Sequence, residues 1–322
     1  MLALWICLAV VVVLIVAIAI FTDFFFDIGV PRVGRTIKPK KGEEQPADPF
    51  EEVMAEGEKW DNAQAMEDVY ITSFDGLKLH ARFFPSEGTA ERAVLCAHGY
   101  RGAPFKDFCT STRWLHEHGC DLLLIDERAH GQSEGKYICY GVKERFDVRD
   151  WSRWLDDRLY GETPIYLYGV SMGCATVMMA SGLELPKNVS GIIADCGYTT
   201  PAAICGRTLY GITRKPIYPM MWFLDLKCRI RAHYSLWGAS ATEALRRDTR
   251  PVLFVHGTAD DFVPPEMTRE NYAACAADKE LFMVKGAKHA NAFLVDPEGY
   301  QQRLTAFFAR CEKRAERPET KV

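Results

Sequence analysis

Hydrophobic and polar positions are distributed very unevenly at the start of the chain. From Leu2 to Phe21 every residue is apolar, and the run contains no glycine or proline. A helix of about 20 residues rises about 30 Å, which matches the hydrocarbon core of a bilayer. We therefore expect residues 1–22 to form a transmembrane anchor. A cleaved signal peptide is the alternative, because residues 17–19 (Ala-Ile-Ala) resemble a cleavage site, but no basic region precedes the run and the run is long for a signal.

The charges beside this span predict its orientation. Only the α-amine precedes it, whereas several basic residues follow it closely: Arg32, Arg35, Lys38, Lys40 and Lys41. By the positive-inside rule we expect a single-pass membrane protein whose body lies in the cytoplasm. Residues 23–68 are mostly polar and predict a charged linker. Within it, Asp48-Pro49 followed by acidic residues predicts a short helix through about Trp60.

Beyond the linker, short apolar runs alternate with longer helical patterns, which is typical of a mostly parallel sheet with helices on both faces. Residues 69–84 pivot on Asp75-Gly76 and predict an antiparallel hairpin. Strands are predicted at 93–97, 121–125, 164–168, 191–194, 251–255 and 281–284, and helices include 146–159 and 300–314. The stretch 198–250 lacks a strand pattern, so we expect a small helical cap inserted into an α/β domain of residues 69–314. The polar residues 315–322 predict a frayed tail.

The overall composition is that of a globular protein. Hydrophobic residues make up 48% and charged residues 25%, with a formal net charge of −4. These values exclude fibrous, disordered and nucleic-acid-coating proteins. The 11 cysteines include no CxxC pair and no cluster with zinc spacing, which favours a reducing compartment. We expect no metal, cofactor or nucleic-acid partner.

A candidate nucleophile follows the predicted strand at 164–168. There the sequence GVSMG (169–173) leads into a helix of small residues, a context in which GxSxG lifts the serine hydroxyl above the sheet edge. A serine nucleophile needs a base and a carboxylate that orients the base. Asp260 and His289 each follow a later strand, so Ser171, Asp260 and His289 come in the order expected for an α/β hydrolase.

Two backbone amides are candidates for an oxyanion hole. Tyr100 follows the strand at 93–97, and Met172 follows the serine, so the topology brings both N–H groups to the same edge.

Together these motifs resemble the α/β-hydrolase superfamily, and more narrowly the bacterial membrane-anchored esterases, monoacylglycerol-lipase-like and serine aminopeptidase S33-like hydrolases. The motifs that carry the resemblance are HGYRG (98–102), DERAHGQSEG (126–135), GVSMG (169–173), DCGYT (195–199), HGTADDFVP (256–264) and KHA (288–290). One departure is Ala129, where relatives often have glycine; it concerns a turn and not the proposed triad. The resemblance implies that Asp260 holds His289, and that His98 and His130 shape loops and do not act as bases.

Several alternatives stay open at this level. Asp195 and Asp261 are the other candidates for the acid, whereas Asp126 is expected to brace its own loop. Cys174 is expected to pack in the helix after the serine, with redox control as the alternative.

The cap supplies candidates for the substrate pocket. Tyr218, Met221, Trp222 and Phe223 could form an apolar wall for an acyl group or could pack the cap onto the core. The cap also carries a group of basic residues that could contact an anionic membrane surface or form a solvated face: Arg207, Arg214, Lys215, Lys227, Arg229 and Arg231.

These observations predict a serine hydrolase that cleaves small carboxylic esters through an acyl-enzyme on Ser171. A peptidase and an acyl thioesterase are the alternatives, because the triad does not encode the leaving group. The alternative from another class is a membrane-tethered binding module without activity. Such modules usually lack a triad residue, whereas Ser171, Asp260 and His289 are all present in this sequence.

Overall fold

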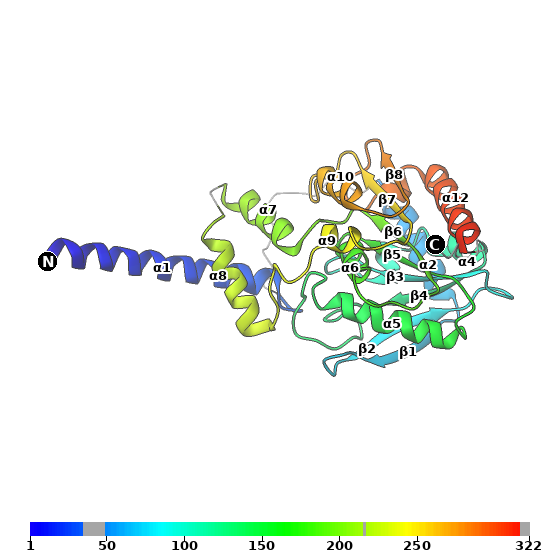
Figure 1. The fold of residues 1–322 in the computed structure, drawn as a ribbon, viewed down its shortest axis with the longest axis horizontal. Helices are drawn as coiled ribbons and strands as arrows, with labels where there is room; N and C mark the ends of the chain where they lie inside the picture. The colour runs from blue at the N-terminus through cyan, green and yellow to red at the C-terminus, as the bar shows by residue number, and fades with distance from the viewer. Residues whose placement is uncertain (35–48, 215–216, 316–322) are drawn as a thin grey trace, which may run out of the picture.

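A computed structural model describes residues 1–34, 49–214 and 217–315. Its centre is an eight-stranded sheet in the order β1-β2-β4-β3-β5-β6-β7-β8 (Figure 1). The strands are β1 (Glu67–Thr72), β2 (Lys78–Phe84), β3 (Arg92–Ala97), β4 (Cys120–Ile125), β5 (Ile165–Val170), β6 (Val189–Asp195), β7 (Val252–Gly257) and β8 (Lys279–Val284). The β1–β2 and β2–β4 pairs are antiparallel and the other pairs are parallel. The predicted fold class is therefore confirmed.

Helices cover both faces of the sheet. Alternation along β3 explains why two cores form, since Leu95 points into one hydrophobic cluster and Val94 into the other. The first cluster includes residues of α5 (Glu144–Arg158) and α6 (Met172–Ala180). The second includes residues of α4 (Thr112–Glu117), α11 (Ala292–Val295) and α12 (Pro297–Ala315). Outside the cap, the described part of the domain also contains α3 (Pro104–Asp107) and α10 (Pro265–Ala274).

The segment between β6 and β7 forms the cap. It contains α7 (Pro201–Thr213), α8 (Met220–Lys227), the π-helix η1 (Cys228–Ala232) and α9 (Ala241–Leu245). In Figure 1, α7 and α8 lie at the end of the domain from which the N-terminal helix projects.

The predicted linker is only partly described. A short helix, α2 (Glu51–Ala63), occupies the predicted place. Its expected N-cap Asp48, most of the basic residues after the span and the last residues of the tail lie outside the described ranges.

The N-terminal helix α1 spans Leu2–Gly29 and is long and apolar enough to cross a membrane. It does not end at residue 22, where the anchor was predicted to become a linker. Its last two turns pack into the protein, and Phe26 is completely buried. From the sequence, Asp23 and Asp27 were assigned to the charged linker. In the structure, Asp23 pairs with Lys227 at 2.8 Å and Asp27 pairs with Arg231 at 3.2 Å. These cap residues neutralise the acids and allow the helix to continue.

Candidate active site

Ser171 occupies a strained turn between β5 and α6. Its φ of 56° and ψ of −113° are unfavourable for a residue with a side chain. A Cβ at Gly173 would collide with the backbone carbonyl of Ala97, and one at Gly169 would collide with the backbone of Gly173. The glycines of the GxSxG sequence therefore permit the close crossing that holds the serine hydroxyl at the carboxyl edge of the sheet.

A continuous chain of hydrogen bonds joins the three residues selected from the sequence. His289 Nε2 lies 2.8 Å from Ser171 Oγ, and His289 Nδ1 lies 2.7 Å from Asp260 Oδ2. The other carboxylate oxygen of Asp260 accepts the N–H groups of Phe262 and Val263, each at 2.9 Å. With Nδ1–H donated to the carboxylate, Nε2 can accept the serine proton.

The electrostatic environment keeps Asp260 ionised. Burial by itself would raise the pKa of this carboxyl group, but hydrogen bonds from His256 and His289 hold the pKa well below its usual value. An anion at this position can hold the His289 tautomer and stabilise its cation.

His256 is a residue of the site that sequence reasoning missed. Its Nε2 lies 3.0 Å from Asp260 Oδ2 and 2.9 Å from the Val263 carbonyl, so this nitrogen carries the proton. Nδ1 then accepts a hydrogen bond of 2.7 Å from the Thr268 hydroxyl. The completely buried ring therefore helps to fix Asp260. The sequence signal that could have identified this residue is the histidine of the HGTADD sequence at the end of β7.

The two alternative acids are engaged elsewhere. Asp195 accepts a 3.0 Å hydrogen bond from the Tyr300 hydroxyl, and its backbone carbonyl accepts the Ser171 N–H at 2.9 Å. Burial raises the pKa of Asp195 to about 6. Asp261 is exposed, and its carbonyl accepts a hydrogen bond from Arg207. Within the described part of the chain, neither carboxylate is bonded to His289.

The loop after β3 brings the Tyr100 amide to the same edge as the Met172 amide. Among the described residues, neither N–H donates a hydrogen bond to the protein, which leaves both for an oxyanion. Asp107 accepts the Gly99 N–H at 2.6 Å and so fixes the start of this loop. This contact therefore helps to hold the loop that carries the Tyr100 amide.

His98 and His130 tie this loop to the one after β4. His98 Nε2 accepts the Glu127 N–H at 3.1 Å, and His130 Nε2 accepts the Arg101 N–H at 3.0 Å. Burial lowers the pKa of both rings, to about 4 for His130, so they stay neutral acceptors. These contacts occupy ring nitrogens that a catalytic base would need.

Comparisons with known proteins agree with this architecture. The family described as "Serine aminopeptidase, S33" matches residues 88–225. The uncharacterised protein YqkD of Bacillus subtilis is 26% identical over 61% of this chain and 66% of its own length. The alpha/beta hydrolase domain-containing protein WAV2 of Arabidopsis thaliana is 26% identical over 66% of this chain and 67% of its own.

Solved structures show the same fold. The esterase Pf2001 of Pyrococcus furiosus superposes with a TM-score of 0.62 and 21% identity over 86% of this chain and 98% of its own. An esterase from Exiguobacterium antarcticum gives a TM-score of 0.54 and 18% identity over 75% and 99%. The chain has the α/β-hydrolase fold.

Within this fold, an apolar cavity of about 210 Å³ opens over Ser171. Its walls come from the cap, the oxyanion loop and, unexpectedly, the end of α1. The lining residues from the cap are Tyr198, Ile204, Cys205, Thr208, Leu209, Ile212, Leu224, Cys228 and Leu236.

The four residues predicted to line the pocket do not line it. Met221 is buried in the hydrophobic core, whereas Tyr218 and Trp222 are 52% and 62% exposed and pack on each other with ring centroids 5.4 Å apart. Phe223 is partly buried, and it is also absent from the cavity wall. The sequence identified the apolar helix, but its rotation about the helix axis depends on the elements packed against it.

The basic residues of the cap are mostly engaged within the hydrolase. Besides the pairs with α1, Arg229 pairs with Asp225 at 2.6 Å and Arg207 donates to the backbone of Asp261 and Phe262. Lys215 lies outside the described residues. Among the described residues, Lys227, Arg229 and Arg231 are therefore paired with acids, whereas the carbonyl contacts of Arg207 leave its charge uncompensated. Contact of the cap with an anionic membrane surface stays a prediction.

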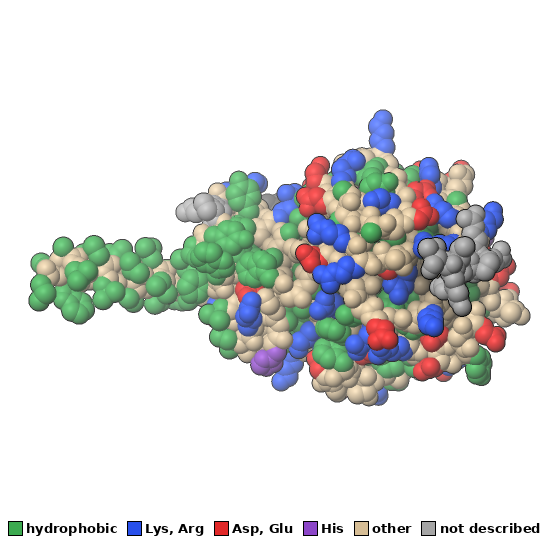
Figure 2. All heavy atoms as spheres, viewed as in Figure 1, with side chains coloured by type: hydrophobic (Ala, Val, Ile, Leu, Met, Phe, Trp, Pro, Cys, Tyr) green, Lys and Arg blue, Asp and Glu red, His purple; other side chains and the backbone are tan. Residues whose placement is uncertain are grey.

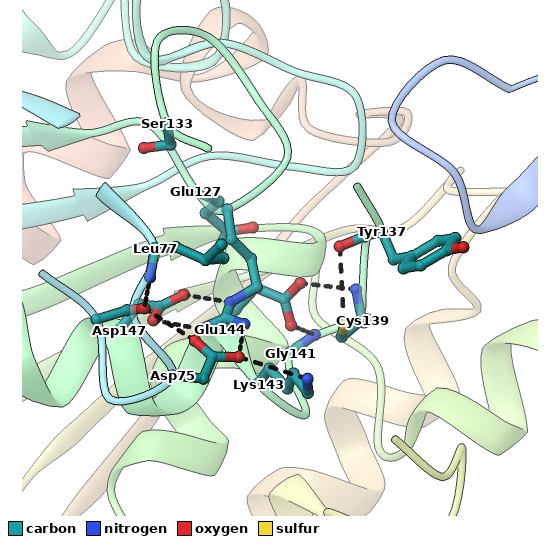
Figure 3. Close-up of polar contacts among 12 residues, drawn as sticks. Asp75, Leu77, Glu127, Ser133, Tyr137, Cys139, Gly141, Lys143, Glu144 and Asp147 are labelled. Atoms are coloured by element: carbon teal, nitrogen blue, oxygen red, sulfur yellow. Dashed lines mark hydrogen bonds and ion pairs between the residues drawn. The ribbon is translucent and has the colours of Figure 1, made fainter. Parts of the chain in front are cut away.

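A buried polar cluster supports the segment that faces the cavity (Figure 3). Arg128 makes a bidentate pair with Asp147, with distances of 2.6 and 2.7 Å, and it also binds Asp75. Glu144 accepts the N–H groups of Cys139 and Gly141 at 2.7 and 2.8 Å. The cluster thereby fixes residues 137–141, which include the cavity-lining Tyr140.

Proposed function

We propose that this protein is a serine hydrolase that cleaves carboxylic esters of apolar acyl groups. The observation that carries the proposal is the Ser171–His289–Asp260 hydrogen-bond chain at the floor of an apolar cavity. His289 takes the serine proton while Ser171 Oγ attacks the ester carbonyl, and the Tyr100 and Met172 amides stabilise the oxyanion. His289 then protonates the leaving alcohol, and water repeats the sequence on the acyl-enzyme.

The cavity favours an ester over the aminopeptidase reaction that the S33 name suggests. An aminopeptidase must hold a positively charged α-amine, which requires an acidic or otherwise strongly polar partner. No carboxylate belongs to the described lining of this cavity. An acyl thioester has the same apolar acyl group, so the choice between oxygen and sulfur leaving groups needs a direct comparison.

The test combines active-site labelling with substrate comparison. A fluorophosphonate probe should label the wild-type protein but not Ser171→Ala. The wild type should hydrolyse p-nitrophenyl butyrate at least tenfold faster, by kcat/KM, than an aminoacyl p-nitroanilide or a butyryl thioester. Absence of labelling in the wild type would favour the non-catalytic binding module, and a preference for the anilide or thioester would overturn the ester assignment.

We also propose that α1 anchors the hydrolase in a membrane with the catalytic domain in the cytoplasm. The apolar residues Leu2–Val16 are exposed along the helix, and basic residues follow it in the sequence. A C-terminal reporter that is active only in the cytoplasm should be active. Activity only of a reporter that requires export would reverse the orientation, and loss of residues 1–19 from the mature protein would identify a signal peptide.

A further inference from the structure

The end of the N-terminal helix forms one wall of the catalytic cavity. Phe25, Ile28, Gly29 and Val30 line the same space as Ser171. Val30 and the neighbouring Phe26 are almost completely buried, so this end of the helix is part of the folded domain. The membrane helix is therefore a component of the site and not only a tether.

Hydrogen bonds fix this wall against the oxyanion loop. The hydroxyl groups of Tyr100 and Tyr140 donate to the Gly29 carbonyl at 2.9 and 2.8 Å, and their rings are stacked with centroids 5.5 Å apart. The Arg101 guanidinium donates to the Ile28 carbonyl at 2.6 Å. Helices leave their last carbonyl groups unsatisfied, and here the active-site loops supply the donors.

The chain after the helix is fixed as well. The Ile138 N–H donates to the Val30 carbonyl at 2.7 Å, and Pro31 forms a β-bridge with Tyr137. The Arg32 side chain donates to the Ser133 carbonyl at 2.6 Å. The buried polar cluster of Figure 3 fixes residues 137–141 through Glu144. The wall formed by the end of α1 is therefore supported by this segment as well as by the oxyanion loop.

The position along α1 relates the cavity to the bilayer. Thr22 is the first polar residue after the apolar run, and Ile28 lies about 9 Å farther along the axis at about 1.5 Å per residue. The polar layer of a bilayer is about 5–8 Å thick on each side. With Thr22 at the edge of the hydrocarbon core, Ile28 lies at the outer edge of this polar layer, so the cavity lies close to the membrane surface.

Exposed apolar side chains lie beside the base of α1. Figure 2 shows hydrophobic side chains on the projecting helix continuing into a patch over the neighbouring cap. The large apolar residues of the cap that are at least half exposed are Tyr210, Ile212, Tyr218, Trp222, Leu226 and Ile230. Ile212 belongs both to this patch and to the cavity lining, so the cavity reaches the surface beside the patch.

We propose that the substrate is a lipid ester with a single acyl chain that enters sideways from the bilayer, and that Phe25 and Ile28 of the membrane helix determine acyl-chain length. The proposal rests on the ester hydrolase function proposed above. A bilayer is the occupant of the exposed cap face because that face is continuous with a helix able to span the membrane, and Lys227, Arg229 and Arg231 beside it are paired with acids. The small apolar cavity fits one chain.

Chain-length profiles of the full chain in nanodiscs test the role of the helix wall. Ile28→Trp fills the cavity and should lower the ratio of kcat/KM for p-nitrophenyl dodecanoate to that for the acetate at least tenfold. Phe25→Ala enlarges the cavity and should move the optimum to longer chains. The matched control is Phe24→Ala, because Phe24 is 41% exposed and lies outside the cavity wall.

Three outcomes separate the two proposals. A wild-type profile in both Ile28→Trp and Phe25→Ala would overturn the specificity role while leaving the esterase proposal intact. The same profile shift in Phe24→Ala would mean that any change in α1 acts indirectly, which also overturns it. Failure of the wild type to hydrolyse even the acetate would instead overturn the proposed function.

A second comparison tests entry from the bilayer. Trp222→Asp places a charge in the exposed cap patch, whereas Tyr160→Asp makes the same change at a residue that is 88% exposed and lies in the turn after α5. With 1-dodecanoylglycerol in phosphatidylcholine vesicles, Trp222→Asp should lower turnover at least fivefold relative to turnover of soluble acetate ester. Equal ratios in the two variants would mean that substrate arrives from water and would overturn entry from the bilayer.

Discussion

The Tyr100 hydroxyl donates a 2.9 Å hydrogen bond to the carbonyl of Gly29, the last residue of α1. The backbone amide of the same tyrosine is one of the two proposed oxyanion donors. One residue thus connects the membrane helix to the catalytic edge of the sheet, although 71 positions separate it from Gly29. The geometry of the oxyanion loop therefore depends on how α1 is seated.

Tyr100→Phe and Tyr140→Phe should each destabilise the protein by about 0.5–1.5 kcal/mol through loss of one hydrogen bond to Gly29. The double variant should lose more than the sum, because only then does the carbonyl lose both phenol donors. Denaturant titration of the full chain in detergent measures these differences. Tyr70→Phe, which removes an exposed hydrogen bond to Gln132, is the control, and strict additivity would contradict the shared-acceptor interpretation.

Asp260→Asn should lower kcat by about 10³–10⁴-fold with little change in folding, because an amide no longer favours the required His289 tautomer. Asp261→Asn should retain most activity, since this exposed side chain makes no bond to His289. Initial rates with p-nitrophenyl butyrate provide the measurement. If the two variants exchanged their behaviour, the neighbouring residue would be the acid.

Gly173→Ala should destabilise the protein by about 1–3 kcal/mol and abolish most activity, because the added methyl group meets the Ala97 backbone rather than a movable side chain. Gly211→Ala makes the same change in α7, where nothing lies within 4 Å of the new Cβ. That variant should be more stable by about 0.5–1 kcal/mol. Thermal unfolding and ester hydrolysis distinguish them, and a fully active Gly173→Ala would refute the tight crossing.

Asp61 in α2 should make stability depend on pH. Burial raises the pKa of this carboxyl group from 3.8 to about 8, so the folded protein retains a proton that the unfolded chain releases. The stabilisation is fully present below pH 4 and is lost between about pH 4 and 8, by up to about 1.4 kcal/mol per pH unit.

Asp61→Asn should remove that slope and raise stability at pH 8. Glu56→Gln, an exposed change on the same helix, should leave the slope in place. Denaturant titrations at pH 5, 6, 7 and 8 test this, and parallel curves for wild type and Asp61→Asn would show that the carboxyl group is ionised in the folded protein.

The sequence was most informative where structure follows from local pattern. Short apolar runs and turn signals specify the strands, and parallel strands bring their carboxyl ends to one edge. That rule selected Ser171, Asp260 and His289, and the structure brings them within hydrogen-bond distance. The apolar character of α1 was equally readable, since the length of an uninterrupted apolar run is a property of the sequence alone.

Tertiary structure decided what each surface contacts. The sequence placed Asp23 and Asp27 in a linker because their partners in the cap lie about 200 residues away along the chain. Only folding brings those charges together. The same holds for the cavity, where Phe25 and Ile28 replace the predicted Tyr218 and Trp222. Composition gives the number of apolar residues, but the rotation and docking of each helix, which depend on packing between distant segments, determine which of them meet the substrate.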